Sequence, residues 1–72
     1  MTTTANTTSF ASHYLAATVH LMDAVAHIGA NRHHRWLGAK NYALLAQRDA
    51  GTPEEVALAA KLIDAIEETE KF

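Results

Sequence analysis

A helix start is encoded at residues 52–55, and it constrains the fold of the chain more than any other feature. Thr52 is placed to accept a hydrogen bond from the third helical N–H, and Glu55 is placed to reach back to Thr52, the pattern of a capping box. Pro53 takes the first helical position, where its missing N–H donor is harmless. An apolar stripe at helical spacing follows the cap: Val56, Ala59, Leu62, Ile63 and Ile66. We therefore predict a helix over residues 53–70.

Residues 10–28 form the first predicted helix, with Ser9 as its N-cap and Gly29 at its end. Its apolar side chains cover about 200° of the helix circumference. They are Phe10, Tyr14, Ala17, Leu21, Ala24, Val25 and Ile28, continued by Leu15, Val19, Met22 and Ala26. A helix this apolar contacts more than one neighbour. We expect it to be either the central helix of its own bundle or a helix shared with a second subunit.

The middle segment, residues 31–50, is predicted as a helix that Asn31 can cap. One side of it is lined by small residues around one indole, and that side would let a neighbouring backbone approach closely: Trp36, Ala39, Ala43, Ala46 and Ala50. Gly38 weakens the helix interior by about 1 kcal/mol relative to Ala. Because Gly29 can end or bend a helix, the first two segments form either a hairpin or one longer bent helix.

Composition limits the size of the core. Fifteen of the 72 residues are Ala, and the chain has no Cys, which excludes a disulfide framework and a thiolate metal site. A core of this size rarely supplies more than about 3–5 kcal/mol of net stability. We therefore predict an all-α fold: a small three-helix bundle over residues 10–72, preceded by a disordered Thr-rich segment at 1–9 and assembled as a two-fold homodimer. With no secretory signal and no bilayer-spanning apolar run, we expect a cytoplasmic protein.

Charge is divided unevenly along the chain. Residues 29–48 carry four basic side chains and no acid, whereas residues 49–72 carry seven acids and two Lys. The basic part has three interpretations: pairing with the acids near the end of the third helix (Glu67, Glu68 and Glu70), recognition of an acidic protein surface, or binding of nucleic acid with an indole stacked on a base. A helix-turn-helix is disfavoured, because Arg35 and Gly38 stand at its inward positions. The candidate partner-binding residues are Arg32, His33, Arg35, Trp36 and Lys40.

Four histidines recur at heptad spacing: His13, His20, His27 and His34. On the first helix they follow the narrow face that the apolar residues leave open, and Asp23 lies beside them. His20, Asp23 and His27 are acceptable Zn²⁺ ligands, so zinc binding is one interpretation. The alternatives are a solvent-facing polar stripe, a partner contact and a general base. No nucleophile is arranged beside them, and a convex helix offers no pocket, so we do not expect an enzyme.

The sequence thus favours a small non-enzymatic interaction module that binds another protein and modulates or inhibits it. Short, Cys-free, mildly acidic helical chains suit inhibitors and adaptors, including inhibitors of the kind that phages encode. A nucleic-acid-binding regulator and a metal-binding helical protein are the alternatives.

Overall fold

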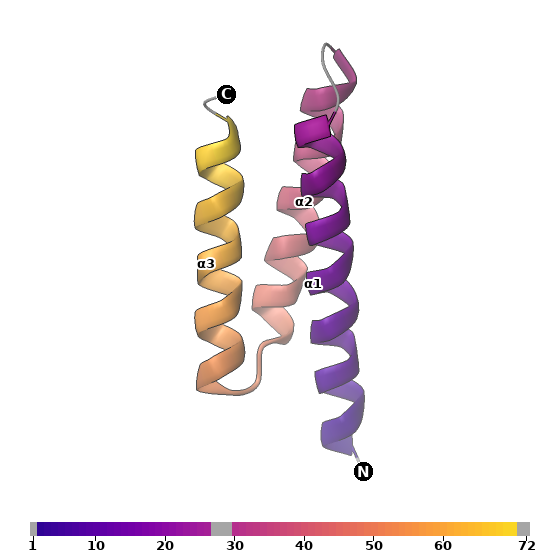
Figure 1. Cartoon of the computed structure of the whole chain (residues 1–72). Coiled ribbons are helices and arrows are strands. Elements are labelled where there is room, and N and C mark those ends of the chain that lie inside the picture. The colour runs from indigo at the N-terminus through magenta and orange to yellow at the C-terminus, as the bar shows by residue number, and fades with distance from the viewer. Residues whose placement is uncertain (1, 27–29, 71–72) are drawn as a thin grey trace.

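The computed structural model describes residues 2–26 and 30–70, which form three helices in the order α1 (Thr2–Ala26), α2 (Ala30–Asp49) and α3 (Pro53–Glu70) (Figure 1). The described residues contain no strand, so the predicted all-α, three-helix architecture is confirmed. None of these helices is long and apolar enough to cross a membrane.

The predicted helix boundaries agree best where a cap is encoded. α3 has the predicted bounds, and α2 is displaced by one residue at each end. α1 begins at Thr2 instead of Phe10, so Ser9 lies inside the helix and is not its N-cap. The predicted end at Gly29 falls outside the described residues. The disorder expected for residues 1–9 stays a prediction.

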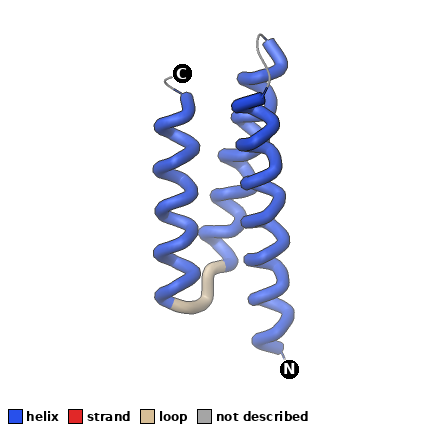
Figure 2. The backbone as a smooth tube through the Cα atoms, in the orientation of Figure 1, coloured by secondary structure: helices blue, strands red, loops and turns tan. Residues whose placement is uncertain are grey.

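The start of α3 uses the predicted capping residues in a slightly different arrangement. The backbone N–H of Glu55 donates to Oγ1 of Thr52 over 3.1 Å. The carboxylate of Glu55 accepts from the N–H of Gly51 over 2.8 Å, one residue earlier than predicted. The first helical bond follows at once, from the N–H of Val56 to the carbonyl of Thr52. The short connection between α2 and α3 therefore turns the chain sharply (Figure 2).

α2 is the central helix of the bundle. α1 lies antiparallel to it along most of its length, α3 packs on another side of α2, and α1 and α3 make few contacts with each other (Figures 1 and 2). α1 and α2 therefore form a hairpin and not one continuous bent helix. The bundle is elongated, 44 × 17 × 14 Å, and the first turns of α1 extend past the connection between α2 and α3 (Figure 1).

Alanines dominate the interface between α1 and α2. Five of them are fully buried: Ala17 and Ala24 of α1, and Ala39, Ala43 and Ala46 of α2. Side chains this small let the two backbones approach closely, as predicted for the Ala-lined side of α2. The bulk of the core comes from α3 and from the indole of α2, through Leu62, Ile66 and Trp36. A second, smaller cluster joins Phe10, Ala46 and Ala59 near the α2–α3 connection.

Candidate interaction surfaces

Trp36 belongs to the core and not to an exposed surface. Its side chain is 6% exposed, and its indole Nε1–H donates to the backbone carbonyl of Ile66 over 2.7 Å. The ring of His33 is stacked against the indole, with centroids 5.9 Å apart, and Nζ of Lys40 lies 5.2 Å from the ring centroid. Trp36 was predicted to contact a partner, but in the structure α3 already covers its indole. The base-stacking platform of the nucleic-acid interpretation is covered with it.

The two arginines before Trp36 are engaged within the chain. Nη2 of Arg32 donates to the backbone carbonyl of Thr69 over 3.2 Å, which places a cation at the carboxyl end of α3, where the helix dipole favours it. Nη1 of Arg35 bonds Oδ2 of Asp23 over 3.3 Å and so ties α2 to α1. The internal interpretation of the basic segment is supported, although Arg35 pairs with α1 and not with the acids at the end of α3.

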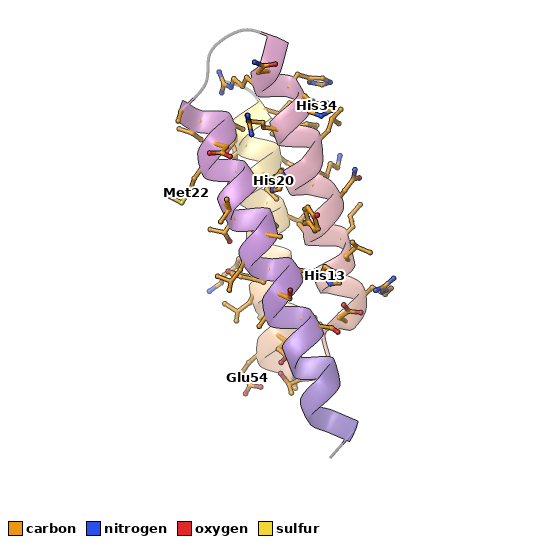
Figure 3. All side chains as sticks on the ribbon, turned by 90° about the vertical axis from the view of Figure 1, so that its right-hand side faces the viewer. His13, His20, Met22, His34 and Glu54 are labelled. Carbon is orange, nitrogen blue, oxygen red and sulfur yellow. The ribbon has the colours of Figure 1, made fainter. Side chains whose placement is uncertain are left out.

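The histidines of α1 face α2. Figure 3 shows His13 and His20 where the two helices meet, and Met22 pointing away on the other side of α1. The ring of Tyr42 lies near both imidazoles, with its centroid 6.2 Å from that of His13 and 5.1 Å from that of His20. The interpretation of the histidines as a solvent-facing stripe is therefore wrong for these two. His27 lies outside the described residues.

His13 forms the polar link between α1 and the end of α2. Its Nδ1 lies 2.8 Å from Oδ2 of Asp49, whose other oxygen accepts from Nε of Arg48 over 3.1 Å. Because an ionised carboxylate only accepts, the Nδ1–H of His13 is the donor. The hydrogen bond from Arg48, and to a smaller extent the one from His13, holds the pKa of the Asp49 carboxyl below its ordinary value.

His20 occupies space that Gly38 leaves open. Its Nδ1–H donates to the carbonyl of Ala16 over 2.9 Å, which fixes the ring against α2. Asp23, one turn further on, is the partner of Arg35. Two of the three predicted zinc ligands thus make contacts within the bundle. Residues 2–26 and 30–70 bring together no group of three or more potential ligands.

The outward face of α1 is part of the apolar arc for which the sequence predicted more than one neighbour, whereas the predicted partner-binding residues lie on α2. We define the α1 apolar face as Leu15, Val19, Met22 and Val25. These four side chains are 63%, 55%, 67% and 61% exposed. They point away from α2 because the fully buried Ala17 and Ala24 occupy the opposite side of the helix. The predicted apolar arc is thus divided between the bundle and an uncovered face.

The covered side of α1 follows one heptad series, Phe10, Ala17 and Ala24, but the exposed Leu15 and Met22 have the same spacing, so periodicity alone does not locate the outward face. Residues seven apart stay on nearly the same side of a helix, so this series marks one line along α1. All three members of the series are buried. A line drawn on the opposite side of α1 passes through Leu15 and Met22.

Electrostatically, the α1 apolar face differs from the surfaces around it. Asp23 is the only charged residue of α1, and it is occupied with Arg35. α2 carries four cations against Asp49, and α3 carries six acids against Lys61. The other exposed large apolar side chains of the described residues belong to these charged helices: Leu37, Leu44, Val56 and Leu58. The α1 apolar face therefore suits an uncharged partner surface.

No protein-family model, no curated protein and no solved structure matches this chain.

Proposed function

We propose that the protein is a small non-enzymatic interaction module that binds a protein chain and modulates it, and that the α1 apolar face is its docking surface. The observation that carries the proposal is the exposure of four large apolar side chains in one uncharged stripe. Contiguous apolar patches on small proteins mark interaction sites, because leaving them in water is unfavourable.

The energetic argument follows from the exposed fractions. Each of the four side chains is more than half exposed, so covering it contributes about 1–2 kcal/mol at roughly 25 cal/mol per Å². The bundle itself derives little stability from its alanine-rich core. Association through this face would therefore also stabilise the fold of the chain.

The proposed docking surface differs from the one expected from the sequence. Arg32, Arg35 and Trp36 make contacts inside the bundle, so their replacement would disturb the fold before it disturbed a partner. His33 is exposed and Lys40 is half-buried, and both lie against the indole of Trp36. The side chains of the α1 apolar face instead point away from the bundle and are more than half exposed.

Site-specific photo-crosslinking in producing cells tests the proposal. A photoreactive amino acid replaces Met22 in one variant and Leu44 in the matched control, an apolar residue of α2 that is 46% exposed. We expect position 22 to yield adducts with a protein identified by mass spectrometry, which is either another protein or a second copy. A second change, Leu15→Glu, should abolish them. Adducts from position 22 no more abundant than those from position 44 would contradict the proposal.

A further inference from the structure

The α1 apolar face can pack against the same face of a second copy of the chain. Its four residues follow one another at steps of four, three and three, which keeps them in a single stripe along the helix axis. We propose that a second copy of this chain is the occupant, with its α1 packed antiparallel on the first. This inference rests on the proposed function and names the partner for the same surface.

Charge favours a second copy over a charged partner. Within residues 9–26 the outward side of α1 presents no Lys, Arg or Glu, and its one Asp is paired with α2. An uncharged stripe gains nothing from an acidic or basic partner, which would have to give up hydration of its charges without compensation. Outside α1, the described residues expose mainly the charged helices α2 and α3. The same face on a second copy is uncharged and apolar, and two-fold symmetry brings the two faces together.

The spacing of large and small residues sets the register. A two-fold axis through the middle of the face places Val19 opposite Met22 of the other copy. In the same register Leu15 lies opposite Ala26, which is exposed and small enough to receive it. In a parallel pair, Leu15 would instead lie against Leu15 of the other copy, and Met22 against Met22.

The size of the face predicts a weak dimer. In this register residues 15–26 of the two copies lie side by side, which is about 18 Å of helix. So short a contact buries less than the roughly 1,200 Å² of the smallest standard-size interfaces and belongs with weak and transient complexes. We expect association with a Kd on the order of tens of micromolar.

Analytical ultracentrifugation over a concentration series tests the choice of partner. We expect the purified chain to shift from monomer to dimer as its concentration rises through the expected Kd. Met22→Glu should remain monomeric throughout the series, because two-fold symmetry would bury a charge in each copy. Leu44→Glu makes a similar change on the outer side of α2 and should dimerise like the parent chain. Circular dichroism of each variant verifies that it is folded.

Engineered cysteines test the register, and the absence of native Cys makes each one unique. In the proposed pair, a cysteine at position 19 lies about 4.5 Å along the helix axis from the cysteine at position 19 of the other copy. For position 15 the corresponding separation is about 16 Å. A disulfide requires Cα atoms within about 7 Å, so Val19→Cys should form a dimeric disulfide and Leu15→Cys should not. Equal disulfide formation at both positions would indicate a parallel pair and overturn the antiparallel proposal.

The outcomes separate this inference from the function on which it rests. A purified chain that stays monomeric at concentrations far above the expected Kd, with no disulfide at either position, refutes the second copy. If position 22 still crosslinks to a different protein in cells, the docking surface stands with another occupant. If it crosslinks to nothing, both proposals fail together.

Discussion

His20 fills the space that a side chain at position 38 would need. A Cβ built on Gly38 would lie 2.7 Å from Cδ2 of His20, closer than such atoms approach in proteins. The ring cannot move freely, because its Nδ1–H is held by the carbonyl of Ala16 and its other side lies near Tyr42. The glycine in the middle of α2 therefore has a packing role that offsets its poor helix propensity.

Gly38→Ala should destabilise the protein by about 1 kcal/mol. Displacing the packed ring costs about 1–3 kcal/mol, and the gain in helix propensity returns about 1 kcal/mol. With His20→Ala already present, the same change should stabilise by about 0.5–1 kcal/mol. Urea unfolding of the double-mutant cycle measures both values. Gly51→Ala is the control, because its Cβ would meet Glu55 at an ordinary 3.9 Å. A destabilisation by Gly38→Ala that persists without His20 would refute this account.

Trp36→Phe should lower the free energy of unfolding by about 1–2 kcal/mol. Phe retains most of the apolar bulk but loses the Nε1–H that donates to Ile66. Trp36→Ala would remove about 3–5 kcal/mol, as much as the whole stability of a domain this small, and is not a usable test. Thermal unfolding of Trp36→Phe beside Leu37→Ala, at an exposed neighbouring position, makes the measurement. A Trp36→Phe protein as stable as the parent chain would show that the indole hydrogen bond contributes nothing.

Acid should weaken the ion pairs of Asp49, chiefly the one with Arg48 and next the one with His13, which joins α1 to the end of α2. The folded pKa of Asp49 is lowered, so its contribution is present above the unfolded value near 3.8 and is lost as pH falls through the folded pKa. Asp49→Asn should therefore flatten the decline in stability below about pH 4. Urea unfolding of both proteins from neutral to strongly acidic pH measures the slopes. Asp64→Asn on the exposed side of α3 removes the same charge as a control. An unchanged acid slope in Asp49→Asn would be the contrary result.

Removing residues 2–8 should change the free energy of unfolding by less than about 0.5 kcal/mol. The backbone of the first turns of α1 extends past the connection between α2 and α3 (Figure 1), and a short length of helix on its own is marginal in water. The same reasoning predicts rapid amide exchange in this segment, as the sequence also does. Hydrogen exchange of the full chain and urea unfolding of the shortened one provide the readouts. A loss above about 1.5 kcal/mol would show that this segment packs on the bundle.

Local signals predicted the parts of the fold that depend on local chemistry. Thr52, Pro53 and Glu55 define where α3 begins, because capping involves neighbours in sequence. The side of α2 that carries Trp36 and Ala39 was also predictable, since its small residues gather on one line. Each of these features requires only the geometry of a single helix.

The orientation of α1 was not predictable in the same way. Apolar residues surround most of this helix, so periodicity alone does not say which of them are covered. Close packing against α2 selects Ala17 and Ala24 over the larger Leu15 and Met22, because only small side chains fit between backbones this near. His20 enters the interface because Gly38, on another helix, makes room for it. That complementarity lies between two segments and not within one.

The central position of α2 has a consequence for how the molecule opens. Most interhelical contacts join α1 to α2, and α3 is held chiefly through α2. We therefore expect α3 to detach before α1, although its departure uncovers Trp36 and removes Leu62 and Ile66 from the core. Beyond the first turns of α1, the chain should thus have two tiers of protection, with the amides of α3 exchanging through a partial opening and those of the paired part of the hairpin only through global unfolding.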